Sequence, residues 1–171
     1  MTDGSTAQHP RHAERKAAHQ KLGEMLIERG KLRRDQLEHA LKMQESMGGL
    51  IGSVLVELGL ISDSDLSETL AESMGLEMID LNRIGAVDPD AAHFIPESIA
   101  RRHKLIGIRF EMSKPERKTP DRVVVAMSDP SDFMALDSIR ASTNMEPIAA
   151  VATRAQISDA LQTAYLESPL S

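Results

Sequence analysis

Apolar positions in the first part of the chain follow a helical spacing, and they follow it twice. When residues 21–44 are laid over residues 50–73, the aliphatic positions coincide, and so do two glycines of each segment. Each copy predicts a short helix, a turn and a longer helix, because apolar residues recur at helical intervals on both sides of Gly30 and Gly59. The duplication therefore predicts four helices in two related pairs.

The pattern changes after Gly75, where short apolar runs replace the helical spacing. Four of these runs predict strands, at 78–81, 105–110, 122–127 and 148–151. Helical segments lie between them, and a polar stretch with two prolines predicts a hairpin connection between the second and third strands. The order of elements indicates an α+β fold, in which the duplicated helical pairs precede a small sheet covered by helices.

These patterns divide the chain into four expected segments. They are a disordered tail (1–19), a subdomain with the duplicated helical motif (20–75), an α/β subdomain (76–167) and a short tail (168–171). The first tail holds three histidines whose spacing allows a metal site, namely His9, His12 and His19. No constellation of carboxylates accompanies them, so we interpret this segment as a solvated tail.

Composition limits what such a fold can do. Apolar residues make up 41% and charged residues 27% of the chain, as in ordinary globular proteins. Aromatic residues are only 2% and the net charge is -6, which argues against a nucleic-acid partner, because such binders need stacking side chains and many cations. The absence of cysteine excludes disulfides and thiolate metal sites. No apolar stretch has the length of a membrane span, so we expect a cytoplasmic protein without membrane insertion.

The glycine near the start of each copy, Gly23 or Gly52, admits two interpretations. Leucines at these intervals suffice for any amphipathic helix pair, so the repeat can be purely structural. Glycine, however, weakens a helix by about 1 kcal/mol relative to alanine. Its presence is more readily explained where a planar ligand or another backbone approaches closely. The second interpretation predicts a binding surface across the two copies.

The duplicated frame resembles the cyclic-di-GMP-binding motif of the MshEN-type domain, the N-terminal domain of type II secretion and type IV pilus assembly ATPases. In both copies an aliphatic–glycine pair opens the frame and aliphatic residues follow at fixed places. A five-residue spacer, 45–49, separates the copies, and the similarity continues to about residue 167. The matching positions are Lys21, Leu22, Gly23, Leu26, Leu32, Leu37, Leu41 and Gln44 in the first copy, and Leu50, Ile51, Gly52, Leu55, Ile61, Leu66, Leu70 and Ser73 in the second.

The resemblance implies a ligand and a division of roles within its site. In that family each copy holds one half of the two-fold symmetric nucleotide, with leucines against the guanines and polar residues making the other contacts. Three polar positions depart from the motif, at Lys21, Leu50 and Ser73, and Asp129 is expected to support the ligand face. Two hypotheses follow. One is a cyclic-di-GMP sensor that acts on a protein partner in a secretion, pilus or motility machine, and the other is a docking adaptor of the same fold that has lost the ligand.

The sequence contains no catalytic motif. It has no Gly-x-x-x-x-Gly-Lys-[Ser/Thr] loop for phosphates, so these residues do not include the ATPase motor, and we expect a non-catalytic module without metal or cofactor. Ser128 and Asp129 have no histidine placed to act as a base, and Pro130 follows them, which favours a strand-to-helix turn. The basic cluster at 101–104 is explained by the dipole of a preceding helix, or by docking of an acidic partner.

Overall fold

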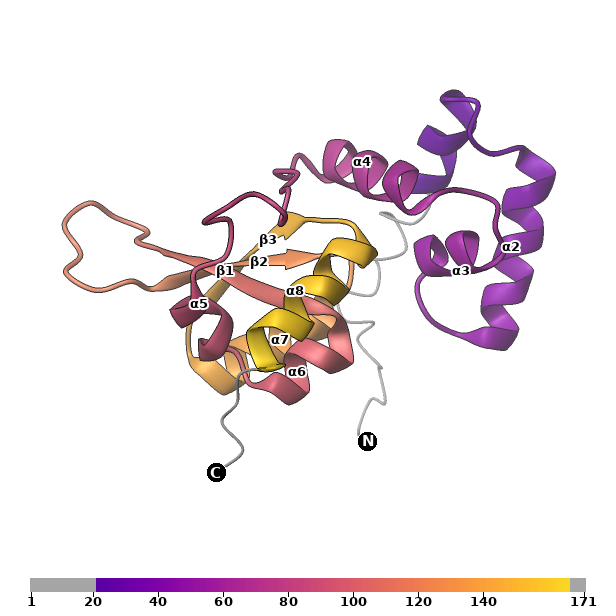
Figure 1. Cartoon of the computed structure of the whole chain (residues 1–171). Coiled ribbons are helices and arrows are strands. Elements are labelled where there is room, and N and C mark those ends of the chain that lie inside the picture. The colour runs from indigo at the N-terminus through magenta and orange to yellow at the C-terminus, as the bar shows by residue number, and fades with distance from the viewer. Residues whose placement is uncertain (1–20, 167–171) are drawn as a thin grey trace, which may run out of the picture.

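The computed structural model describes residues 21–166 (Figure 1). The expected tails at 1–19 and 168–171, with the three tail histidines, lie outside the described residues. Within the described part of the chain, no helix is both long enough and apolar enough to cross a membrane.

The helical half consists of the four helices that the repeat predicts. Residues 21–28 form the first helix, and the others are α2 (Arg34–Met47), α3 (Ile51–Glu57) and α4 (Asp63–Met74). Gly30 and Gly59 follow the short helices at equivalent places and have φ of 69° and 71°. Glycine adopts this left-handed conformation at the least steric cost. The predicted pair of related helical hairpins is therefore confirmed.

Aliphatic side chains from both copies of the repeat form one buried cluster in this half. Its large members are all 8% exposed or less, and they are Leu22, Leu26, Leu32, Leu37, Ile51, Val54, Leu55, Ile61, Leu66 and Leu70. Burial of one such side chain contributes about 2 kcal/mol. Because the cluster draws on both copies, each helical pair provides part of the apolar surface that the other needs.

The second half is a three-stranded sheet with four helices. Its elements are α5 (Pro89–Phe94), α6 (Glu97–His103), β1 (Leu105–Glu111), β2 (Arg122–Met127), α7 (Phe133–Thr143), β3 (Glu146–Val151) and α8 (Arg154–Leu166). The strand order is β1-β2-β3, with β1 and β2 antiparallel and β2 and β3 parallel. The polar stretch at 112–120 joins β1 to β2 as the long hairpin loop in Figure 1. The α+β prediction is confirmed.

The predicted strand at 78–81 is wrong. Met78 makes one isolated parallel bridge to Val151, in which the Ile79 amide donates to the Val151 carbonyl at 2.8 Å. The chain then leaves the edge of β3, because the Leu81 amide donates instead to Oε1 of Gln156 in α8, at 3.1 Å. The backbone groups of this short apolar run are thus satisfied by a helix side chain rather than by a strand ladder.

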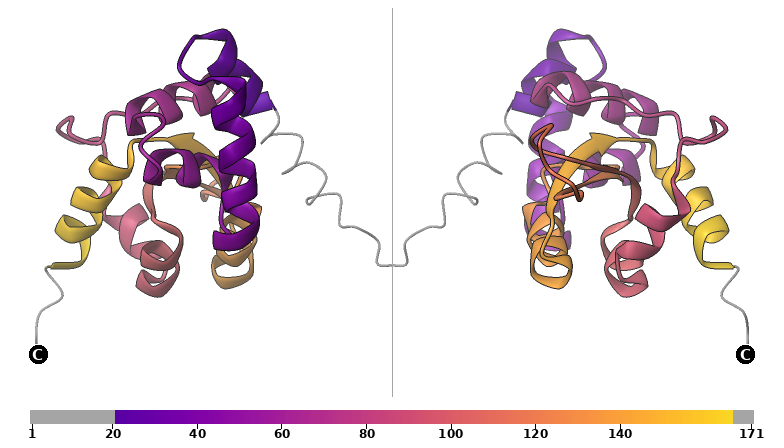
Figure 2. Two further views of the ribbon diagram at one scale, coloured as in Figure 1. Left: turned by 90° about the vertical axis from the view of Figure 1, so that its right-hand side faces the viewer. Right: turned by 90° about the vertical axis from the view of Figure 1, so that its left-hand side faces the viewer.

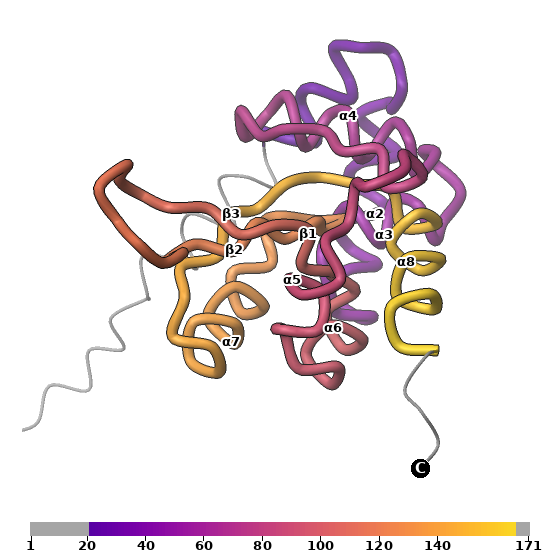
Figure 3. Tube along the Cα trace, turned by 60° about the vertical axis from the view of Figure 1, so that its left-hand side comes forward, coloured from indigo at the N-terminus to yellow at the C-terminus, as the bar shows by residue number. Residues whose placement is uncertain are grey.

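The helices of the second half lie together against the sheet (Figure 3). Figure 2 shows α6 between α7 and α8, which it contacts on its two sides. The buried cluster beneath them contains the three central valines of β2 and aliphatic side chains of every helix from α5 to α8. From the helical half, α4 contacts β3, so the end of the second motif copy adjoins the edge of the sheet.

Candidate functional site

Each motif glycine is covered by a leucine of its own copy. A Cβ atom on Gly23 would lie 2.8 Å from Cδ2 of Leu37, and a Cβ atom on Gly52 would lie 2.7 Å from Cδ1 of Leu66. These distances are inside van der Waals contact, so the absence of a Cβ atom lets the leucine rest directly on the short helix, and a methyl group there would displace the flexible end of that leucine. In this structure a leucine of the same copy makes the close approach at each glycine, and the binding surface expected across the two copies stays a prediction.

Most apolar positions of the candidate site belong to the core of the helical half. Leu22, Leu26, Leu32, Leu37, Ile51, Leu55, Ile61, Leu66 and Leu70 are all buried. Leu41 differs from them, since 42% of its surface is exposed. Leu50 is half-buried. Of the two exposed or half-exposed leucines, Leu41 on α2 presents more of its surface to a flat ligand.

Two polar positions of the motif donate hydrogen bonds to backbone carbonyls near the ends of the copies. Lys21, the first position of the first copy, donates from Nζ to the carbonyl of Ser73, the last position of the second copy, at 2.8 Å. Gln44, the last position of the first copy, donates from Nε2 to the carbonyl of Gly49, the residue before Leu50, at 2.8 Å. The first bond joins the start of the first copy to the end of the second, and the second bond closes the spacer between the copies.

Charged side chains also connect the two copies. Arg29 forms an ion pair with Glu72 and donates to Oγ1 of Thr69. Lys31 lies 3.5 Å from the Asp65 carboxylate. These pairs are partly exposed, so each contributes at most about 1 kcal/mol, and their main effect is to fix the register of the copies.

Within the first copy, a bidentate pair joins the short helix to α2. The guanidinium of Arg34 donates to both carboxylate oxygens of Glu24, at 3.1 Å each. These hydrogen bonds, and to a lesser degree the charge of Arg34, hold the pKa of Glu24 below its ordinary value. The pair braces the turn around Gly30.

Asp129 lies where the two halves of the molecule meet. It is 5% exposed, and its Oδ1 accepts hydrogen bonds from the amide and the hydroxyl of Ser131. Its Oδ2 lies 3.5 Å from the position that a Cβ atom on Gly52 would take. Asp129 is part of the turn between β2 and α7, closed by the Asp132 amide on the Asp129 carbonyl at 3.2 Å, which confirms the predicted strand-to-helix turn.

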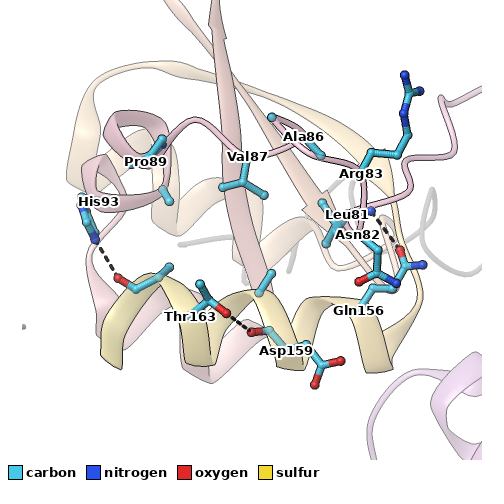
Figure 4. A pocket seen from close by; sticks show the side chains of 14 residues that line it. Leu81, Asn82, Arg83, Ala86, Val87, Pro89, His93, Gln156, Asp159 and Thr163 are labelled. Carbon is cyan, nitrogen blue, oxygen red and sulfur yellow. Dashed lines mark hydrogen bonds between the residues drawn. The ribbon is translucent and has the colours of Figure 1, made fainter. Parts of the chain in front are cut away.

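The structure also holds a cavity that the sequence did not indicate (Figure 4). About 360 Å³ lies between the 81–87 segment, α5 and α8, above an apolar floor that includes Leu81, Val87 and Ala160. His93 bonds the carbonyl of Ala164 at one end, and the side chain of Arg83 extends away from the cavity. None of the motif residues lines it. Residues 82–85 form a turn beside the cavity, with Gly85 at a φ of 78°, and a turn is all that these residues predict from the sequence.

No group of three or more histidine, aspartate or glutamate side chains among residues 21–166 is arranged to hold a metal ion. The candidate site consists of aliphatic side chains and two glycines, with Lys21, Gln44, Ser73 and Asp129 as its polar members. Such a set binds an organic ligand by apolar contact and a few oriented polar groups.

Comparison with known proteins identifies relatives in two machines. The type IV pilus assembly ATPase PilB of Myxococcus xanthus is 29% identical over 147 residues, which cover 86% of this chain and 24% of the relative. The type II secretion system protein E of Xanthomonas campestris is 28% identical over 152 residues, which cover 89% of this chain and 26% of the relative. The type IV pilus assembly ATPase PilB of Thermus thermophilus is 32% identical over an alignment of 187 residues, which covers 88% of this chain and 20% of the relative. The chain therefore spans about a quarter or less of each relative.

Solved structures match over a larger share of their own length. MshE with cdg is 32% identical, has a TM-score of 0.66, and is matched over 84% of this chain and 98% of that one. The N-terminal domain of XpsE is 29% identical and has a TM-score of 0.68. The match covers 85% of this chain and 94% of that one. The model of the MshEN domain matches residues 74–169, and the structural matches extend further, into the helical repeat. We conclude that the chain belongs to the MshEN domain family.

Proposed function

We propose that the chain is a non-catalytic regulatory module that binds cyclic-di-GMP across its duplicated helical half. The observation that carries this proposal is that two copies of one motif pack around a shared core, with Lys21 of the first copy bonded to Ser73 of the second. Cyclic-di-GMP consists of two identical nucleotides related by a two-fold axis. A surface built from two copies of one motif offers each nucleotide one copy of the motif.

The side chains along this surface suit the chemistry of the proposed ligand. Leu41 offers exposed apolar surface on which a guanine excludes water. Lys21 is exposed and carries a full positive charge for a phosphate, although an ammonium group lacks the bidentate fork of arginine. Gln44 offers both an amide donor and an oxygen acceptor to a base edge. Asp129, beside Gly52, connects the same surface to the sheet.

The relatives indicate where such a module acts. The structure of MshE, of which 98% of the solved chain matches this one, was determined with cdg, that is, cyclic-di-GMP. The curated relatives are pilus assembly and secretion proteins, of which this chain corresponds to a small part. We therefore propose that the nucleotide changes how the module contacts a protein of a pilus, secretion or motility machine. This requires a higher affinity for the ligand in one arrangement of the two halves than in another.

Calorimetric titration of the full chain with cyclic-di-GMP tests the proposal, with GTP and cyclic-di-AMP as controls. We expect selective binding, and we expect Lys21→Met to weaken it by about tenfold or more, because a charged hydrogen bond is lost. The matched control is Lys114→Met, which removes the same charge from the hairpin loop. Unfolding free energy changes by less than about 1 kcal/mol in both variants, since both lysines are exposed. Absence of heat from a folded protein would contradict the proposal.

A docking adaptor that has lost the nucleotide is the second candidate function. Leu50 and Ser73, which depart from the nucleotide-binding motif, favour this function. Lys21 and Gln44 favour it as well, because they already donate to carbonyls of the chain itself. Ser73→Gln separates the two functions. If the nucleotide surface persists, the longer amide side chain strengthens cyclic-di-GMP binding, whereas an adaptor binds no nucleotide with either residue.

A further inference from the structure

A groove between α6 and α8 gathers cations on a protein whose net charge is -6. The two helices contact each other and lie side by side in Figure 3. The groove has a volume of about 190 Å³ and is lined by Arg101, Lys104, Arg154, Ser158, Leu161 and Gln162. Its cations come from two segments far apart in the sequence, so the fold rather than a single basic run creates this positive site.

Lys104 occupies a backbone position that is unfavourable for lysine. It is the first residue after α6 and has φ of 52° and ψ of 65°, in the left-handed region. Glycine and asparagine adopt this conformation most easily, and Asn144 is the other non-glycine residue between 21 and 166 that has it. Backbone strain at one residue is a reason to ask what its side chain does. The Lys104 side chain lines the groove.

Arg154 lies at the N-terminus of α8, where a positive charge does not stabilise the helix. It is the first residue of α8, at the positive end of the helix dipole, and the first turn of α8 contains no acidic residue. The acidic group at this end is Asp63 of α4, whose Oδ2 accepts the Ala155 amide at 3.3 Å. Asp63 forms no ion pair with Arg154. Helix stability therefore does not account for this arginine.

The charges of the groove are largely uncompensated within the described residues. Arg101 pairs with Glu97 at 2.8 Å and lies over the Tyr165 ring at 5.5 Å, so its guanidinium is held in place. Lys104 and Arg154 take part in none of the ion pairs found in residues 21–166. Most other arginines of the described chain do form such pairs. The groove thus presents two unpaired cations beside one held arginine.

From these placements we propose that the groove between α6 and α8 binds an acidic segment of a protein partner. Carboxylates of that segment pair with Lys104 and Arg154, and Ser158 and Gln162 bond its backbone. An extended acidic segment fits better than a compact anion, because the cations lie on two helices along an open groove. The inference goes beyond nucleotide binding, which concerns the other half of the molecule, so either proposal can fail without the other.

Fluorescence anisotropy of the full chain with a labelled peptide tests this surface. The probe peptide alternates glutamate and glycine, and its control has glutamine in place of glutamate. We expect the acidic peptide to bind at about 50 mM salt, and more weakly at about 300 mM. Lys104→Gln with Arg154→Gln weakens binding by about tenfold or more. Lys114→Gln with Lys118→Gln, which removes equal charge from the hairpin loop, changes it by less than about twofold. Circular dichroism melting confirms that each variant is folded.

Three results would overturn the proposal. The first is no binding of the acidic peptide at low salt. The second is an equal loss in both pairs of variants, which shows that attraction by the overall charge, not the groove, holds the peptide. The third is displacement of the peptide by inorganic phosphate at a concentration at which sodium chloride of equal ionic strength has no effect. That result identifies a phosphate site instead of a peptide site.

Discussion

Gly107→Ala is expected to destabilise the fold by about 3 kcal/mol, a large part of the 5–15 kcal/mol that holds an ordinary domain together. A Cβ atom at this position would lie 2.3 Å from the carbonyl oxygen and 2.9 Å from the carbonyl carbon of Ala91. Both are backbone atoms of α5, so they cannot rotate away as a side chain can. The pairing of β1 with β2 shifts register between Gly107 and Arg109, at the place where α5 approaches the sheet.

Urea unfolding followed by far-ultraviolet circular dichroism measures this effect. Gly23→Ala is the matched control, because its new methyl group meets only the flexible end of Leu37, and alanine favours the helix by about 1 kcal/mol. We expect the control to lose less than about 1 kcal/mol. Similar losses in the two variants would show that the contact between α5 and β1 is less close than the structure indicates.

Leu66→Ala is expected to cost about 2–5 kcal/mol of unfolding free energy, whereas Leu41→Ala costs less than about 1 kcal/mol. Leu66 is 1% exposed and fills the space over Gly52, so its truncation leaves a cavity in the helical half. Leu41 is 42% exposed and leaves none. The two residues are both leucines at motif positions, but one is buried and the other is exposed. Leu66 supports the fold, and we propose that Leu41 faces the ligand.

A double-mutant cycle sharpens this distinction. In the wild-type background, Gly52→Ala places a methyl group against Leu66, but in the Leu66→Ala background that methyl group enters the vacated space. Gly52→Ala should therefore cost less in the second background than in the first. If the costs are additive, or if Leu41→Ala destabilises the protein as much as Leu66→Ala, the division between supporting and ligand-facing leucines is wrong.

The sequence predicted the helical half well because its signals are local. Apolar spacing defines each helix, and glycines at equivalent places of the two copies end the short ones, so no long-range information was needed. The strand at 78–81 was mistaken because its four residues are too few to show a period. Whether they pair depended on Gln156, far along the chain, which takes the Leu81 amide away from the sheet.

The site was harder to predict than the fold. Spacing showed which residues are equivalent between the copies, but it did not show that nine of the aliphatic positions are buried while Leu41 is exposed. The meeting of Lys21 with Ser73 depends on how the two helical pairs pack, and so does the place of Asp129 beside Gly52. The division into subdomains at residue 75 stays a proposal, which the two separate buried clusters support.

The most direct test of the central claim is nuclear magnetic resonance of the ¹⁵N-labelled full chain, at 18.8 kDa, during titration with cyclic-di-GMP. Our proposal predicts saturable shifts of amide signals in both motif copies, around Lys21, Leu41 and Ser73, and near Asp129. Leu41→Glu, which places a charge on the exposed leucine, should abolish them while the remaining spectrum stays that of a folded protein. Shifts confined to the cavity between α5 and α8, or no saturable shifts at all, would contradict it.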